Sequence, residues 1–219
     1  MSGPGTFRDG IRAGLPFFLP TAAIGISFGV VTRSLGWDLG APIVMSAIVY
    51  SGSAQFAATS VLGDGGTVFS AVLAAALVNA RFLPMGMAFA PALEGGPVRR
   101  AAEGQAVVDA SWALANRGGR FDRKLLLGAT LPQYVGWFVG TVIGAVAGSS
   151  IGDPAELGLD AMFPAFFLAL LVPELRASER ALGVAAAGGL LALALTPLTS
   201  PGIPIVAASL ASLYGVRRR

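Results

Sequence analysis

Apolar residues fill long runs of this chain, and short polar connections separate the runs. Four runs are each long enough for a helix of about 20 residues that crosses a lipid bilayer: residues 15–35, 41–62, 68–93 and 125–149. Shorter apolar runs follow at residues 161–172, 181–195 and 205–214. The pattern predicts an all-α integral membrane protein, a polytopic helical bundle with about 6–8 membrane segments, some of them short or broken.

Glycine and proline mark where these helices should turn, pack or break. Residues 36–40 and 63–66 are Gly-containing turns. In the run at 125–149, glycine recurs at every fourth position, which predicts a smooth groove filled by the backbone of a neighbouring helix: Gly136, Gly140, Gly144 and Gly148. Gly25 and Gly29 form a second close-packing surface of this kind. The proline-rich residues 196–204 separate the last two runs, either as a break between half-length helices or as a loop between tilted spans.

Two polar clusters interrupt the apolar runs. In a continuous helix Ser51, Gln55 and Thr59 share one face, so residues 51–56 predict a polar stripe at membrane depth. Asn79 and Arg81 lie two positions apart, and both can reach one site only if the helix opens there. Pro84 supplies a cause for such an opening, because its ring clashes with the carbonyl of Ala80. A structural reading stays open, in which these side chains tie helices together.

Composition and charge agree with a membrane protein. Charged residues make up 12% of the chain and mean hydropathy is +0.72, whereas soluble domains carry about 25% charged residues. The net charge is +3, but the basic residues sit in short connections and at the ends, which indicates membrane orientation and not nucleic-acid binding. The chain has no cysteine and no histidine, which excludes disulfides and disfavours zinc binding and an intramembrane enzyme.

The charged residues also suggest how the chain is organised. We expect a single transmembrane domain over residues 1–219, with two related halves as one reading: residues 8–93 and 125–216, joined by the charged segment 94–124. This reading rests on matched spacings, from Pro16 to Gly36 and from Pro132 to Gly152.

Basic residues also predict which side of the membrane each connection occupies. Those in residues 117–124, 176–180 and 217–219 place these segments, including the C-terminus, in the cytoplasm. Arg8 and Arg12 favour a cytoplasmic N-terminus, which requires the weakly apolar helix expected at residues 101–116 to cross. An inverted duplication would instead require an odd number of spans before Leu125. The count is odd if the helix at residues 101–116 lies at the membrane surface and does not cross. A crossing helix and a surface helix therefore both stay open.

Several of these segments together resemble the AzlC/YgaZ family, the large subunit of bacterial branched-chain amino acid exporters. The resemblance runs nearly from end to end, and its most specific parts are residues 50–56, Tyr-Ser-Gly-Ser-Ala-Gln-Phe, and residues 79–81, Asn-Ala-Arg. Residues 7–10, 14–16, 85–86 and 137–144 add to it. The chain departs from the family pattern at Phe82, where members often carry His, and at Ala110, where Asp-Glu is often found.

The resemblance implies a multi-pass protein of the bacterial cytoplasmic membrane that exports branched-chain amino acids of the L-valine class. It implies a small hydrophobic partner similar to the AzlD/YgaH subunit. From composition and charge placement we expect no cofactor, no metal and no nucleic-acid partner. Two alternatives are a structural membrane subunit of a transport complex and a transporter of another small amino acid or zwitterion.

An amino acid zwitterion needs an anion pocket, a cation pocket and a dry slot for its side chain. Arg81, or backbone N–H groups at a helix break, would take the carboxylate. The ammonium would meet side-chain oxygens, beside Gly52: Ser51, Ser53, Gln55 and Asn79. Phe56 and Phe82 would wall the aliphatic group. Asp109 either carries coupling protons or is a solvated or salt-bridged structural acid.

Overall fold

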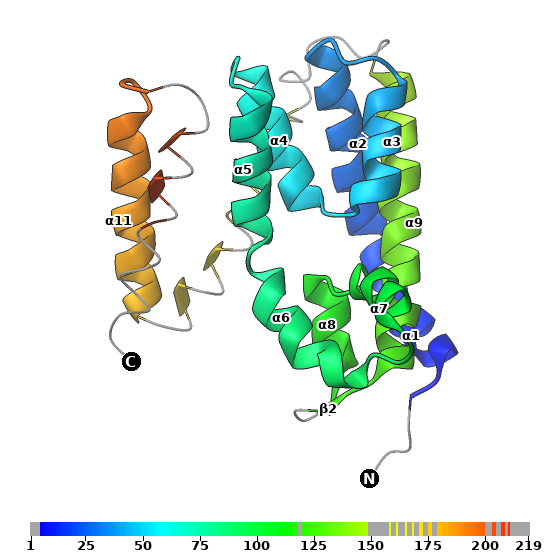
Figure 1. Cartoon of the computed structure of the whole chain (residues 1–219). Coiled ribbons are helices and arrows are strands. Elements are labelled where there is room, and N and C mark those ends of the chain that lie inside the picture. Colours follow the sequence, from blue (N-terminus) through cyan, green and yellow to red (C-terminus); the bar gives the residue numbers. More distant parts are fainter. Residues whose placement is uncertain are drawn as a thin grey trace. The chain divides into compact units, whose positions relative to one another are not determined.

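The computed structural model describes residues 5–117, 120–148 and 179–199, with isolated positions between 158 and 176 and between 203 and 210. Helices dominate these residues (Figure 1). The chain forms two compact units: unit 1 is Met1–Gly52 with Ala80–Pro154, and unit 2 is Ser53–Asn79 with Ala155–Arg219. The described part of the chain is thus mostly helical with one short hairpin, as the predicted fold class requires, while the division into halves at 8–93 and 125–216 stays a prediction.

Unit 1 begins with a helix that starts earlier than the apolar pattern predicts. α1 (Phe7–Gly14), a 3₁₀ turn (Leu15–Phe17) and α2 (Phe18–Ser34) follow one another as a single stretch of 28 residues, apolar enough to cross a membrane. Its start is fixed by a capping box: the Asp9 N–H donates to Oγ1 of Thr6 over 3.1 Å, and the Thr6 N–H donates to Oδ2 of Asp9 over 3.0 Å. Pro16 tightens one turn without ending the stretch.

The regularly spaced glycines of α9 (Arg123–Ala147) lie against the backbone of α2. A Cβ atom on Gly140 would lie 2.2 Å from the Ala22 carbonyl oxygen, and one on Gly144 would lie 2.1 Å from that of Ile26. From the other side, a Cβ on Gly25 would lie 2.6 Å from the Trp137 carbonyl oxygen. The predicted groove and its complement on α2 are therefore confirmed, because only glycine allows this approach.

The same contacts give the direction of the two helices. Gly136, Gly140 and Gly144 meet the carbonyls of Phe18, Ala22 and Ile26 in that order, so α2 and α9 run parallel, side by side (Figure 1). An inverted repeat would place equivalent segments antiparallel. Inversion therefore does not relate these two segments.

The predicted continuous helix over residues 41–62 is wrong. α3 (Gly40–Val49) ends at Tyr50, and α4 (Gly52–Gly63) starts two residues later. Tyr50 has φ 32° and ψ 54°, a left-handed conformation that stops a helix. Ser51 lies in the break, so it does not continue the helical face of Gln55 and Thr59.

The opening predicted near Arg81 is confirmed. α5 (Val68–Asn79) ends before Ala80, and α6 (Phe82–Phe89) begins after Arg81, followed by a 3₁₀ turn (Ala90–Ala92). Within the described residues, two helical stretches are long and apolar enough to cross a membrane, Phe7–Ser34 and Arg123–Ala147, and α5 with α6 makes a third if counted as one broken span. The larger number of segments expected from the sequence stays a prediction.

The charged region folds differently from the single helix expected at residues 101–116, so that prediction is wrong. α7 (Pro97–Gly104) and α8 (Asp109–Ala115) are separated by a tight turn, in which the Val107 N–H donates to the Gly104 carbonyl over 3.0 Å. Gly104 ends α7 because glycine is a poor helix former that accepts a turn. A short hairpin follows, with β1 (Asn116–Arg117) paired to β2 (Arg120–Phe121).

Side chains from α6, α8 and α9 build the hydrophobic core at this end of unit 1. Its buried members come from four segments: Phe89, Ala106, Val107, Ala115, Leu125 and Leu126. The Phe121 ring of β2 lies 5.3 Å from that of Phe89 and 5.0 Å from that of Trp112, which joins the hairpin to this core.

Unit 2 contains most of α4, all of α5 and α11 (Glu179–Leu195). The predicted turn at residues 63–66 is confirmed, because Gly65 has φ 81° and the Gly66 N–H donates to the Val61 carbonyl over 2.8 Å. The C-terminal residues 217–219 lie outside the described residues, as do Gly152 and most of the runs at 161–172 and 205–214.

Candidate functional site

The break after α3 exposes the carbonyl end of a helix inside unit 1. Carbonyl groups in the last turn of a helix have no partner further along it and carry the negative end of the helix dipole. One of them, the carbonyl of Ala47, accepts a hydrogen bond of 2.9 Å from the hydroxyl of Tyr134 on α9. The left-handed backbone of Tyr50 costs about 1–3 kcal/mol for a non-glycine residue, a strain that proteins retain mainly at functional sites.

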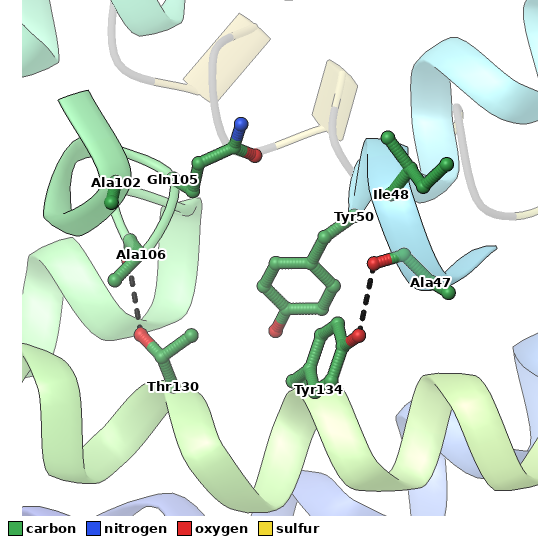
Figure 2. A pocket seen from close by; sticks show the side chains of 8 residues that line it. All are labelled: Ala47, Ile48, Tyr50, Ala102, Gln105, Ala106, Thr130 and Tyr134. Carbon is green, nitrogen blue, oxygen red and sulfur yellow. Dashed lines mark hydrogen bonds between the residues drawn. The ribbon is translucent and has the colours of Figure 1, made fainter. Parts of the chain in front are cut away.

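A cavity of about 290 Å³ lies beside this break, between α3, α7 with the turn that follows it, and α9 (Figure 2). Eight residues from these three places line it: Ala47, Ile48, Tyr50, Ala102, Gln105, Ala106, Thr130 and Tyr134. The rings of Tyr50 and Tyr134 meet edge to face with centroids 5.0 Å apart. Pockets for small molecules start at about 300 Å³, so the cavity suits a ligand the size of a small metabolite.

Buried hydrogen bonds hold the walls of the cavity in place. The Thr130 hydroxyl on α9 lies 3.0 Å from the Ala106 carbonyl oxygen and 2.8 Å from the Ser111 hydroxyl, within hydrogen-bonding distance of both. The amide of Gln133 donates to the same Ser111 hydroxyl over 3.1 Å. These bonds fix α8 and the turn before it to α9, because breaking one would leave a buried polar group unpaired.

The predicted site residues fall into two groups that belong to different units. Ser51, Gly52, Arg81, Phe82 and Asp109 lie in unit 1, with Ser51 buried at the helix break. Gly52 lies against the Trp137 ring, and a Cβ there would approach that ring to 2.9 Å. The other four lie in unit 2. Ser53, Gln55 and Phe56 are buried in α4, and Asn79 is half-buried at the end of α5.

The structure brings Arg81, Phe82 and Asp109 together. Nη2 of Arg81 lies 3.0 Å from Oδ2 of Asp109, and Nε lies 3.3 Å from Oδ1, so the guanidinium holds the carboxylate with two bonds. The guanidinium also lies 4.7 Å from the centre of the Phe82 ring. Asp109 begins α8, so this ion pair joins α8 to the start of α6. Arg81 therefore already has a carboxylate ligand, supplied by the protein itself.

The structure also shows residues that sequence reasoning missed. None of the nine predicted site residues lines the cavity, whereas Tyr50, Gln105, Thr130 and Tyr134 do. Tyr50 directly precedes the polar motif, and Tyr134 follows Gln133 in an otherwise apolar run. Their polar neighbours within apolar runs could have marked both tyrosines as candidate site residues. No pattern marks Gln105. Among the described residues, no three His, Cys, Asp or Glu side chains are placed to hold a metal ion.

Comparison with known proteins decides the family. Residues 16–151 match the family model described as AzlC protein, which is more than half of the 219 residues. The chain belongs to the AzlC family. The match includes α2, the break at Tyr50, the Arg81–Asp109 pair and α9.

Curated relatives extend the similarity beyond that region. The inner membrane protein YgaZ of Escherichia coli is 27% identical over 207 residues, 87% of this chain and 82% of the relative. The branched-chain amino acid transport protein AzlC of Bacillus subtilis is 27% identical over 172 residues, 77% of this chain and 67% of the relative. A membrane protein of Archaeoglobus fulgidus is 28% identical over 207 residues, 94% of this chain and 91% of the relative. No solved structure matches the chain.

Proposed function

We propose that this chain is the large subunit of an exporter of branched-chain amino acids of the L-valine class, in the bacterial cytoplasmic membrane. It would act with a small hydrophobic subunit similar to AzlD/YgaH, with its C-terminus in the cytoplasm. Membership of the AzlC family supports this proposal, as does the Bacillus subtilis relative that is named for branched-chain amino acid transport.

The observation that carries the proposal is the cavity beside the helix break. A broken helix presents backbone carbonyls to a substrate at membrane depth, a device that transporters use for small charged molecules. Here the break lies next to a cavity of about 290 Å³ whose walls are mostly apolar. A purely structural subunit has no need of such a cavity or of the strained backbone at Tyr50.

Arg81 and the predicted residues around it would serve a different step of transport, because they do not line the cavity. The guanidinium of Arg81 would take a substrate carboxylate in exchange for that of Asp109, and Asp109 would then carry a coupling proton. The roles proposed for Ser51, Ser53, Gln55, Phe56 and Asn79 are separate hypotheses, and each is tested by single replacement in the assay below.

The test is efflux of a labelled amino acid panel from vesicles that hold the chain and its small partner, with and without a pH gradient. We expect L-valine, L-leucine and L-isoleucine to leave faster than from empty vesicles. Arg81→Ala should slow export by about tenfold or more, since hydrogen bonds to charged groups are worth about 1.5–3 kcal/mol. Arg120→Ala, which removes an exposed arginine from the hairpin, is the matched control and should change nothing.

Two outcomes would contradict the proposal. If every amino acid left at the rate of empty vesicles, the chain would not be an exporter of this class. If Arg81→Ala exported at the normal rate in a correctly assembled complex, Arg81 would have no part in substrate transfer. Normal assembly with no transport by the wild-type complex would favour the structural-subunit alternative.

A further inference from the structure

The cavity beside Tyr50 presents two polar side chains that the protein leaves unused. Neither the hydroxyl of Tyr50 nor the amide of Gln105 has a hydrogen-bond partner within the described part of the chain. Figure 2 shows the Tyr50 hydroxyl directed into the space between Thr130 and Tyr134, with the Gln105 amide on the opposite wall. Tyr50 is half-buried and its hydroxyl faces the cavity, so a ligand or water can complete its hydrogen bonding, whereas Gln105 is exposed and its amide is open to solvent and ligand alike.

The Tyr50 side chain is held in this position from two directions. Its backbone has a positive φ of 32°, the single positive value at a non-glycine residue in the described chain, and its ring meets the edge of Tyr134. The Tyr134 hydroxyl is in turn fixed to the Ala47 carbonyl. A site that binds a small molecule tightly needs such fixed groups, because each one ordered in advance lowers the entropy cost of binding.

The charges at the cavity restrict what it can hold. None of its eight lining residues has an ionised side chain. A ligand with a net charge would therefore find no opposite charge among the lining side chains to offset the hydration that it gives up on contact. A zwitterion has no net charge, and the ends of its dipole can be met by dipoles of the protein: the carbonyl end of α3 for an ammonium group, and the Gln105 amide and Tyr50 hydroxyl for a carboxylate.

We infer that this cavity is the binding site for a net-neutral amino acid with an apolar side chain, oriented by Tyr50 and Gln105. The apolar lining, Ile48, Ala102 and Ala106, would contact the side chain of the ligand. Amino acids with a net charge, such as L-lysine and L-glutamate, are excluded for want of a countercharge. This inference rests on the proposed function and names the site and the substrate class that the function requires.

The experiment measures binding of labelled L-valine to the full-length chain in detergent, together with export from vesicles. Tyr50→Phe removes only the hydroxyl and should weaken L-valine binding about tenfold. Ala102→Leu places a larger side chain in the cavity and should abolish binding. Ala101→Leu is the matched control, since Ala101 is an exposed neighbour on α7 that does not line the cavity, and it should bind like wild type. Unlabelled L-leucine should compete, whereas L-lysine and L-glutamate should not.

The outcomes separate the site from the function. Wild-type binding and export by both Tyr50→Phe and Ala102→Leu would overturn this site and leave the exporter function standing. Binding of L-valine that is sensitive to both substitutions, without export from vesicles that hold the wild-type chain and its small partner, would support the site and overturn the function. Competition by L-lysine as strong as that by L-leucine would overturn the assignment of substrate class.

Discussion

At the scale of single residues, Glu103 shows how one carboxylate can join distant parts of unit 1. Its two oxygens accept hydrogen bonds from Arg123, at the start of α9, and from Arg99, four positions earlier on α7. The hydrogen bonds from Arg123, followed by the one from Arg99, lower the pKa of Glu103 from 4.5 to about 2. The carboxylate side chain is only 11% exposed, so solvent screens these contacts weakly.

This lowered pKa predicts a pH dependence of stability. A carboxyl group whose pKa falls on folding stabilises the native state above its unfolded pKa, and this contribution is lost as the pH falls through the folded value. We expect Glu103→Gln to lower the thermal stability of the protein in detergent at pH 7, and the difference from wild type to shrink between about pH 4.5 and 2.

Glu94→Gln is the control for this experiment. Glu94 lies 3.6 Å from Arg123, but its side chain is 72% exposed, so its replacement should matter little at any pH. A Glu103→Gln variant as stable as wild type at pH 7 would show that this ion pair network does not stabilise unit 1.

At the scale of elements, unit 1 depends on close contact between α2 and α9. Bilayer lipid is as apolar as a leucine side chain, so membrane helices associate mainly through tight packing and polar contacts. The glycines of α9 allow tight packing. Thr141 of α9 supplies a polar contact, because its hydroxyl lies 2.9 Å from the hydroxyl of Ser46 on α3. α9 is therefore the helix on which α2 and α3 assemble.

Gly140→Ala tests this packing. The added Cβ would meet the Ala22 carbonyl oxygen at 2.2 Å, and a backbone oxygen cannot rotate away as a side chain can. We expect a loss of stability of about 1–3 kcal/mol, the usual range for overpacking, measured as thermal unfolding in detergent. Gly183→Ala in α11 is the matched control, because no described residue lies within 4 Å of its Cβ position, and it should be neutral or slightly stabilising.

At the scale of the molecule, the parallel course of α2 and α9 has a consequence for topology. Arg8 and Arg12 lie at the start of one stretch, and Arg123 and Lys124 lie at the start of the other. If both stretches cross the membrane, all four basic residues lie on one side. The positive-inside rule then places that side in the cytoplasm.

Cysteine labelling tests this topology, because the chain has no cysteine of its own. Arg12, Lys124 and Leu39 are all exposed, and Leu39 lies in the connection at the far end of α2. Cells that carry Arg12→Cys or Lys124→Cys should resist an impermeant thiol reagent added outside, whereas Leu39→Cys should react. Labelling of Arg12→Cys and Lys124→Cys from opposite sides would contradict parallel crossings, and the cysteine-free parent chain gives the background.

The fold and the site were predictable to different degrees. Helical breaks near Arg81 and the glycine groove of α9 could be read from the sequence, because proline and glycine act on their own helix and its immediate surface. The break at Tyr50 was missed because tyrosine rarely adopts a left-handed conformation, and no local pattern announces it. The turn within residues 101–116 was missed since the helical periodicity continues across Gly104.

The sequence by itself determined the class of protein, its main helical stretches, the family and the presence of an arginine too costly to leave without a partner. These follow from composition and from periodicity along one helix. Only the tertiary structure decided that Asp109 is the partner of Arg81, that α2 and α9 run parallel, and that Tyr50, Gln105 and Tyr134 surround one cavity. Such contacts join residues that are far apart along the chain, so they depend on how helices pack and not on any local pattern of residues.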